Sequence, residues 1–494
     1  MRLNELAKAA GMPGCRSEVE VTGIATDSRS VRPGDLFVAL PGARTQGLAH
    51  VPDALERGAV AVCAPAPVYG VPTLLAGNPR RALAALAAAF HAFPAHELPL
   101  IGITGSLGKT STALLLEAAL RASGIRAGVI GSLGVRLDGE SRSTGMTTPE
   151  APAIHAALRR FVDAGAGVAL MEVTTHAIVH ERVTGLVFGL GIITNLVPDE
   201  HLEFHPTPEH YVRTKARFFD MLAEGAPLVL NADDETLRTV TASLRRPMVR
   251  VAGVDATAAD VYARGVTLGA EGTTFELAMT HPLMRADGST VEPVTIPVEL
   301  SLLGRQQVTN AALAATAALL AGATTDGVRQ AFAAIPQPVR RMQVVHPRDP
   351  FVLDDTVGNP ASIRAVFETV AAIPHERLFV AYAVRGARGV AINRCNAEAL
   401  ADCLSGARVE LVVTASEDEA DERNRVAEPE WEAVVETLRA RGIGFRAEPA
   451  LRAAVTDLVG ASGAGDLVLL LGAQGMDRGA DVVRETLRGR SRVA

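Results

Sequence analysis

Short, uninterrupted runs of apolar residues alternate along this chain with longer segments in which apolar residues recur at helical spacing. Strands that are buried on both faces have such uninterrupted runs, so the pattern predicts an α/β protein with parallel sheets covered by helices. The clearest strand candidates lie in the middle and in the last third of the chain, at residues 98–103, 167–173, 190–194, 227–230, 378–383, 409–414 and 466–471.

Breaks in this pattern divide the chain into predicted domains. One break is Phe93-Pro94, which follows an alanine-rich helix, and the other is the proline-rich segment 335–338, which we interpret as a hinge. We therefore expect a small α/β domain, a central domain with a parallel sheet and a C-terminal Rossmann-like domain, at residues 1–96, 97–335 and 336–494.

Other local patterns refine this division. Short β-rich segments separated by Pro-Gly turns fill much of the first domain, and residues 265–300 look like an antiparallel β insertion in the second. We expect helices over 209–222 and 310–320. The acidic, polar stretch 417–432 predicts a solvated loop.

Composition narrows the class of protein. The chain has 494 residues and a net charge of −7, with acidic and basic residues interspersed, which argues against a nucleic-acid-binding surface. Its four cysteines are scattered, as in reduced cytosolic proteins. The N-terminus lacks the apolar core of a signal peptide, and no segment approaches the roughly 18 to 20 apolar residues of a membrane span. We expect a cytoplasmic protein without a membrane span.

A glycine-rich turn between the strand at 98–103 and the following helix carries the strongest chemical signal. The turn has the sequence Gly-Ser-Leu-Gly-Lys-Thr from Gly105 to Thr110. Glycines at such a turn let backbone N–H groups surround phosphates, and the helix N-terminus adds partial positive charge. Lys109 can reach the outer phosphates, and the Thr110 hydroxyl can bind Mg²⁺. The spacing departs from the strict phosphate-loop pattern, yet the context favours nucleotide binding over an ordinary turn.

Further candidates follow the predicted strands. Glu172 stands at a strand end, where ligands of open α/β sheets bind, and could hold Mg²⁺. His201 lies in a cluster of acids and histidines after the next strand. By spacing alone Lys215 is an ordinary helix lysine, and Arg341 with the pair Asp354-Asp355 could be nucleotide contacts or surface charges.

Taken together, these motifs resemble the Mur ligases, which are ATP-dependent amide-forming enzymes of peptidoglycan precursor synthesis. The resemblance covers nearly the whole chain. It implies that Glu172, His201 and a carbamylated Lys215 act with Lys109 in catalysis, and that Mg²⁺ is held by Thr110, Glu172, His201 and the carbamylated lysine. It also implies an ATP site formed by Gly105, Ser106, Leu107, Gly108, Lys109, Thr110, Ser111, Asn310, Arg341, Asp354 and Asp355.

Within the family, the N-terminal half is similar to the MurE type, which adds the third residue of the stem peptide. This resemblance implies that UDP-N-acetylmuramoyl-dipeptide is one substrate and that a free amino acid is the other. The residues that it assigns to the UDP-linked substrate are Thr26, Ser28, Ala43, Arg44, Thr45, Thr147, Thr148, Thr174, His180 and Arg182. Arg182 would pair with an acidic group of that substrate.

The phosphate turn and the C-terminal domain depart from the MurE pattern. Ser106 and the segment 354–360 are closer to the MurF type, which adds the terminal dipeptide, and the motif of diaminopimelate-adding enzymes is missing at residues 414–418. Candidates for the acceptor site are Arg385, Arg388 and Asp477. Ornithine, lysine or another amine stays open as the acceptor.

We therefore expect a monomeric ligase that uses ATP and Mg²⁺ to add an amino acid to UDP-N-acetylmuramoyl-L-Ala-D-Glu through an acyl phosphate. Two alternatives remain. One is a MurF-type or diverged ligase with another acceptor, and the other is a non-catalytic nucleotide-binding regulator that kept the fold.

Overall fold

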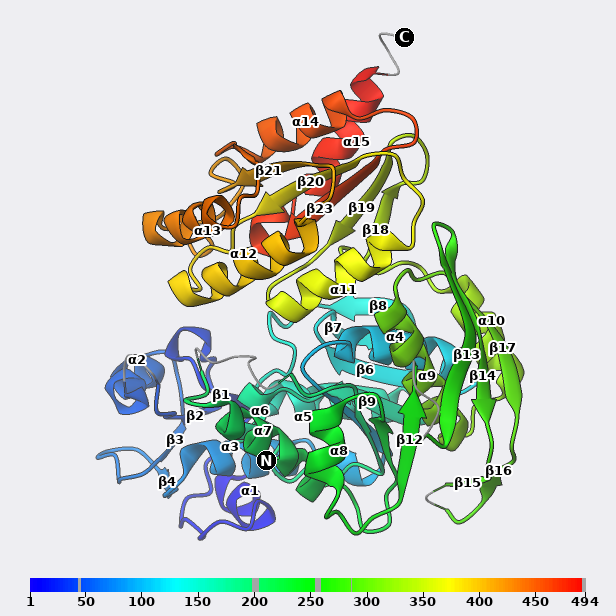
Figure 1. Cartoon of the computed structure of the whole chain (residues 1–494). Coiled ribbons are helices and arrows are strands. Elements are labelled where there is room, and N and C mark those ends of the chain that lie inside the picture. The colour runs from blue at the N-terminus through cyan, green and yellow to red at the C-terminus, as the bar shows by residue number, and fades with distance from the viewer. Residues whose placement is uncertain (43–45, 198–203, 254–258, 286, 491–494) are drawn as a thin grey trace.

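The computed structural model describes the chain apart from residues 43–45, 198–203, 254–258, 286 and 491–494, and its strands form three main sheets in sequence order (Figure 1). Among the strands that the structure describes, no sheet combines strands from two of the three predicted domains. We keep 1–96, 97–335 and 336–494 as proposed domain boundaries. Among the helices that the structure describes, none has the length and apolar character needed to cross a bilayer.

The N-terminal part is a four-stranded parallel sheet in the order β1-β2-β3-β4. Its core contains the alanine- and leucine-rich face of the last helix, which begins at a proline after the N-cap Asn78. The elements are α1 (Leu3–Ala9), β1 (Gly23–Ala25), β2 (Asp35–Val38), α2 (Val51–Glu56), β3 (Ala61–Ala64), β4 (Thr73–Leu75) and α3 (Pro79–Phe90).

The central part is built on an eleven-stranded sheet in the order β17-β14-β13-β12-β11-β10-β5-β9-β6-β7-β8. The strands from β13 to β6 in that order are parallel, and antiparallel strands flank them at both edges. The strands are β5 (Leu100–Thr104), β6 (Ala127–Gly131), β7 (Gly134–Leu137), β8 (Glu140–Arg142), β9 (Val168–Glu172), β10 (Leu190–Ile193), β11 (Leu228–Asn231), β12 (Met248–Ala252), β13 (Val261–Gly269), β14 (Gly272–Met279) and β17 (Thr295–Leu300).

Helices cover this sheet and close its core. Helix α9 is buried along nearly its whole length, since alanines let it pack closely against the sheet and α4. The helices are α4 (Lys109–Ala122), α5 (Ala151–Asp163), α6 (Thr175–Val179), α7 (Pro208–Ala216), α8 (Glu235–Thr241), α9 (Arg305–Leu320) and α10 (Thr325–Ala334). A separate hairpin joins β15 (Leu283–Met284) and β16 (Thr290–Val291).

The C-terminal part is a six-stranded sheet in the order β18-β19-β23-β20-β21-β22, parallel except for β18. Its strands are β18 (Gln343–His346), β19 (Phe351–Asp355), β20 (Leu378–Ala383), β21 (Val409–Thr414), β22 (Arg446–Ala447) and β23 (Leu467–Gly472). Its helices are α11 (Pro360–Ala371), α12 (Val390–Leu404), α13 (Glu428–Ala440), α14 (Leu451–Ala461) and α15 (Gly479–Arg490). Figure 1 shows this part above the central sheet, with α11 facing it.

The strands predicted from apolar runs are confirmed as β5, β9, β10, β11, β20, β21 and β23, and the antiparallel insertion is confirmed by β13, β14 and β17. Two predicted elements need correction. The acidic stretch 417–432 is not all loop, because α13 begins at Glu428 with a proline in its first turn. The helix expected over 209–222 is α-helical only to Ala216 and continues as a 3-10 turn, Arg217–Met221.

His155 on α5 provides a test of this packing. Its side chain is 2% exposed and its Nδ1 has no hydrogen-bond partner among the residues that the structure describes. Burial lowers the pKa of His155 to about 4, helped by the positive charges of His91 and His96. As the pH falls below about 6.5, His155 therefore binds a proton in the unfolded chain but not in the folded protein. The unfolding free energy decreases for this reason between about pH 6.5 and 4.

We expect the wild-type protein to lose about 2 kcal/mol more of its unfolding free energy between pH 7.5 and 5.0 than His155→Gln does. Urea unfolding at the two pH values measures this difference. His281→Gln, which replaces an exposed histidine, serves as the control and should follow the wild type. An equal loss in the wild type and in His155→Gln would contradict the assignment of a buried neutral imidazole.

Candidate active site

The glycine-rich turn joins the end of β5 to the start of α4, and two of its glycines adopt backbone conformations that other residues rarely adopt. Gly105 has φ of 143° and Gly108 has φ of 84°, conformations that favour glycine. A Cβ atom at Gly105 would lie 1.9 Å from Thr194 Oγ1, and one at Gly108 would lie 2.3 Å from Asn310 Oδ1. The side chains of Thr194 and Asn310 thus pack closely against the backbone of the turn, and α4 begins directly after Gly108. N–H groups of the first helical turn have no acceptor within the helix.

Two lysines meet at this turn. Lys109 Nζ donates to the carbonyl oxygens of Gly105 at 2.7 Å and Ser106 at 2.9 Å. Lys215 Nζ donates to the same Gly105 oxygen at 2.8 Å, although its side chain is only 2% exposed and α7 carries it. It also lies 5.0 Å from the centre of the Tyr211 ring. The turn thus brings two lysine side chains to one carbonyl oxygen, and both residues line the adjacent cavity.

Glu172 forms the other side of the turn. It is the last residue of β9, is 1% exposed and accepts hydrogen bonds from Thr110 Oγ1 at 3.0 Å and from Ser132 Oγ at 3.2 Å. The Ser132 N–H donates to the second carboxylate oxygen at 2.9 Å. A carboxylate with two hydroxyls is a set of hard oxygen donors that fits Mg²⁺. The described residues include no group of three His, Cys, Asp or Glu side chains that could hold a metal.

Residues after β10 hold the turn in place. Asn195 Oδ1 accepts from the Leu107 N–H at 2.8 Å, and the Asn195 carbonyl accepts from the Ser106 N–H at 3.0 Å. Thr194 Oγ1 donates to the Leu107 carbonyl. The Ser106 hydroxyl lies 2.6 Å from the Tyr211 hydroxyl. Sequence reasoning missed Asn195 and Tyr211 as partners of the turn and Ser132 as a partner of Glu172, although Asn195 directly follows a predicted strand.

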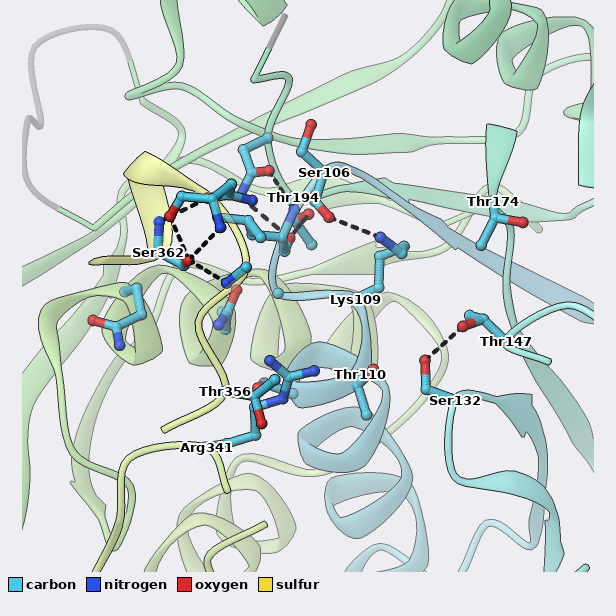
Figure 2. A pocket seen from close by; sticks show the side chains of 18 of the residues that line it. Ser106, Lys109, Thr110, Ser132, Thr147, Thr174, Thr194, Arg341, Thr356 and Ser362 are labelled. Atoms are coloured by element: carbon cyan, nitrogen blue, oxygen red, sulfur yellow. Dashed lines mark hydrogen bonds between the residues drawn. The ribbon is translucent and has the colours of Figure 1, made fainter. Parts of the chain in front are cut away.

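A cavity of about 700 Å³ opens beside the turn and extends to the C-terminal part of the chain. Figure 2 shows its lining, with Lys109, Thr110 and Ser132 from the central part and Arg341, Thr356 and Ser362 from beyond the hinge segment. Of the residues predicted for ATP, those that line the cavity are Ser106, Leu107, Gly108, Lys109, Thr110, Ser111, Asn310, Arg341 and Asp355.

The two aspartates at the end of β19 occupy different surroundings. Asp355 lines the cavity and accepts from the Met342 N–H at 2.6 Å, whereas Asp354 is fully buried, does not line it and pairs with Arg340 at 3.3 Å. Burial raises the pKa of Asp354 to about 7, with the Arg340 guanidinium opposing the rise. Burial likewise raises the pKa of Asp355 to about 6, opposed by the charge of Arg341. Only Asp355 is placed to face a ligand in the cavity.

Residues predicted for the UDP-linked substrate fall into three groups. Those that line the cavity beside the phosphate turn are Thr147, Thr148, Thr174, His180 and Arg182. Arg182 lies 2.8 Å from Glu150 and donates to the Thr148 carbonyl at 3.0 Å, which fixes its guanidinium at the cavity wall. Burial, followed by the charges of neighbouring arginines, lowers the pKa of His180.

Other predicted residues lie elsewhere. Thr26 directly follows β1, Ser28 begins the 3-10 turn Ser28–Ser30, and neither residue lines the cavity. Four predicted residues lie outside the described part of the chain, namely Ala43, Arg44, Thr45 and the proposed metal ligand His201.

The three candidates for the acceptor site are not brought together. Arg385 lines the cavity, and its guanidinium donates to the Gly358 carbonyl at 2.6 Å. Arg388 is exposed and does not line it. Asp477 also lies outside the lining and forms an ion pair with Arg340. Only Arg385 is therefore placed to contact a ligand in this cavity.

The site combines a phosphate turn on a parallel sheet with two lysines at one wall of the cavity and Arg341, from the C-terminal part, at the other. This arrangement is typical of nucleotide-using enzymes of the α/β class. Comparison with protein families identifies this class. The profile for the Mur ligase catalytic domain matches residues 20–91, that for the Mur ligase middle domain matches 103–318, and that for the Mur ligase glutamate ligase domain matches 340–474. The chain belongs to the Mur ligase family, whose members are ATP-dependent, Mg²⁺-requiring ligases of peptidoglycan precursor synthesis.

Curated relatives match over nearly the full length. The chain is 34% identical over 495 residues to the UDP-N-acetylmuramyl-tripeptide synthetase of Roseiflexus sp. (strain RS-1), covering 96% of this chain and 94% of the relative. It is 30% identical over 502 residues to the UDP-N-acetylmuramoyl-L-alanyl-D-glutamate--2,6-diaminopimelate ligase of Rhizobium meliloti (strain 1021), covering 99% and 97%.

Solved structures share the fold at lower identity. The structure of a UDP-N-acetylmuramoyl-L-alanyl-D-glutamate--2,6-diaminopimelate ligase matches with a TM-score of 0.67 at 21% identity. The match covers 99% of this chain and 100% of that one. The MurF ligase from Thermotoga maritima in complex with ADP matches with a TM-score of 0.66 at 20% identity, covering 96% and 99%. These matches confirm the predicted three-domain α/β architecture.

Proposed function

We propose that this chain is a MurE-type ligase, which uses ATP to join an amino acid to the D-Glu carboxylate of UDP-N-acetylmuramoyl-L-Ala-D-Glu. The observation that carries the proposal is the convergence of Lys109, Lys215 and Thr110 on one wall of a cavity whose other wall carries Arg341. Glu172 lies behind this wall and accepts a hydrogen bond from the Thr110 hydroxyl. The full-length identity to a tripeptide synthetase supports the choice of substrate class.

In the first step, a carboxylate oxygen of the substrate attacks the γ-phosphorus of ATP, and ADP leaves. Lys109 and the N–H groups at the start of α4 balance the negative charge that moves to the leaving oxygen. Arg341 approaches the phosphates from beyond the hinge. Thr110 and Glu172, with His201 and a carbamylated Lys215, would hold Mg²⁺, which would supply further positive charge beside the phosphates.

In the second step, the amine of the acceptor attacks the carbonyl carbon of the acyl phosphate. The amide forms, the nitrogen loses a proton and phosphate leaves from the tetrahedral intermediate. Chain residues act mainly by holding the two reactants together and by keeping water out, since an acyl phosphate hydrolyses readily. Arg182 and Arg385 both line the cavity. We assign Arg182 to the acidic part of the UDP-linked substrate and Arg385 to the acceptor. Thr26, Ser28 and residues 43–45 of the N-terminal part would hold the uridine end.

A MurF-type or otherwise diverged ligase and a non-catalytic regulator are the alternatives. Phosphate release from ATP distinguishes all three. With the UDP-linked dipeptide and Mg²⁺, we expect release that depends on one member of a panel of free amino acids, with ornithine and lysine as first candidates. Release only with D-Ala-D-Ala and the UDP-linked tripeptide would favour the MurF type. No release with any amine would favour the regulator. We further propose that the protein works as a monomer in the cytoplasm, where ATP and UDP-linked precursors are available.

A further inference from the structure

Arg340 is an unusual residue at the start of the C-terminal part. It follows the hinge segment 335–338, has φ of 55°, a conformation in which residues other than glycine are uncommon, and is only 7% exposed. A buried arginine must have its guanidinium N–H groups satisfied. The contacts of Arg340 therefore indicate why the chain keeps an arginine here.

The guanidinium of Arg340 connects two neighbouring strand ends. It donates to Asp354 Oδ1 at the end of β19 at 3.3 Å. It also donates to the Gly472 and Ala473 carbonyls at the end of β23, the latter at 2.8 Å, and to Asp477 in the loop that follows. A planar group with several fixed donors can satisfy such a set, whereas the compact ammonium of lysine cannot reach all of it.

The backbone around Arg340 is fixed as well. Its carbonyl accepts from the Thr356 N–H at 3.0 Å. The N–H of Met342, two residues later in the chain, donates to Asp355 at 2.6 Å. Arg341 lies between these two anchors and lines the cavity. The direction in which Arg341 leaves the backbone is thus set by contacts with Asp355 at the end of β19 and with Thr356 directly after it.

The second arm of the guanidinium reaches the loop after β23. Residues 472–477 lie at the carboxyl end of the C-terminal sheet, where open α/β sheets bind their ligands. The Gly475 carbonyl in this loop accepts from the buried Ser416 Oγ at 2.6 Å, which links it to the end of β21. Arg340 directly precedes the nucleotide contact Arg341. Its side chain therefore connects this part of the backbone with the loop after β23, on the proposed acceptor side.

We propose that Arg340 is a positioning residue that ties the nucleotide-contacting Arg341 to the acceptor-side loop 472–477, so that both move as one body with the C-terminal domain. The inference rests on the proposed function, because it assumes that ATP and the acceptor bind on these two sides. Arg340 itself does not line the cavity, so its effect on either ligand is indirect.

The test is a substitution that removes the side chain and leaves the backbone unstrained. Arg340→Gly fits the positive φ, and Asp354 can take up a proton once its partner is gone, because its pKa is raised to about 7. We expect the KM for ATP and the KM for the amino acid each to rise about tenfold, as is typical when a charged, hydrogen-bonded group is lost. Added guanidinium ion should restore both KM values in Arg340→Gly. The variant Arg340→Lys should keep both KM values raised.

Arg377→Ala is the matched control. Arg377 pairs with Asp466 at 2.6 Å at the other end of the same sheet, away from the cavity. It should lower thermal stability without changing either KM. If Arg340→Gly leaves both KM values at the wild-type level, or if guanidinium restores neither, the proposal is wrong. If Arg340→Gly does not fold, Arg340→Lys gives the same two constants.

The failure of the proposed function would be recognised separately. In that case the wild type would release no phosphate with any amine. Binding of ADP, measured by calorimetry on the whole chain, would then still report the arm through Arg341. Weaker ADP binding in Arg340→Gly than in Arg377→Ala supports the positioning role, and equal binding contradicts it.

Discussion

Replacing Lys109 with alanine is expected to lower the rate of ADP release by about a thousandfold, the upper range seen when a preorganised donor to a developing negative charge is removed. Lys109 lies at the first position of α4, and its ammonium group reaches back over the turn to the Gly105 carbonyl. No other residue of the turn carries a full positive charge. The loss should therefore appear mainly in kcat, because charge on the leaving oxygen grows in the transition state.

The chain provides a clean control for this experiment. It contains only three lysines, Lys8, Lys109 and Lys215, among a combined total of 48 lysines and arginines. Lys8 is exposed on α1 of the N-terminal part. Lys8→Ala should keep the wild-type rate of ADP release. If Lys109→Ala releases ADP nearly as fast as the control Lys8→Ala, the phosphate-loop assignment is wrong.

Lys215→Ala is expected to be inactive, with a rate at least about a hundredfold below the wild type. The reason differs from that for Lys109. We propose that Lys215 acts after reacting with CO₂, because carbamylation converts a buried cation into an anion that can support Mg²⁺ beside Glu172. Short carboxylates such as acetate or formate should then restore part of the rate in Lys215→Ala, because they supply an anion to the emptied space.

Carbamylation can also be observed directly. With ¹³CO₂, the wild type and Lys8→Ala should show a carbamate carbon resonance that Lys215→Ala lacks. Lys109→Ala should not gain activity from carboxylates, since its missing group is a cation. Full activity of Lys215→Ala without any added carboxylate would show that the carbamate is not needed.

Much of the fold was predictable because buried parallel strands leave an unmistakable apolar run. The strand over Leu378–Ala383, for example, was predicted with the bounds that the structure gives it. The start of α13 at Glu428 was missed because the acidic composition of 417–432 outweighed the helix signal. That signal is the proline after Glu428, together with Glu430, whose carboxylate accepts from the Ala427 N–H at 2.9 Å.

The candidate site was predictable in its types of residue and less so in their connections. Strand ends pointed to Glu172, but Lys215 could not be assigned from helical spacing, since nothing local shows that α7 brings it to the Gly105 carbonyl. The rarity of lysine in an arginine-rich chain is a signal that could have raised its weight. Asp354 was grouped with Asp355 because they are neighbours, yet alternation along β19 places their side chains in different surroundings.

The chemistry that the two walls of the cavity support makes one prediction about atoms. If a substrate carboxylate attacks ATP, one of its oxygens must leave with the phosphate. UDP-N-acetylmuramoyl-L-Ala-D-Glu labelled with ¹⁸O in the D-Glu side-chain carboxylate, incubated with ATP, Mg²⁺ and the productive amino acid, should give inorganic phosphate carrying one labelled oxygen per amide formed. Two results would contradict the account. One is amide formation accompanied by unlabelled phosphate, and the other is release of unlabelled phosphate while the dipeptide stays unchanged.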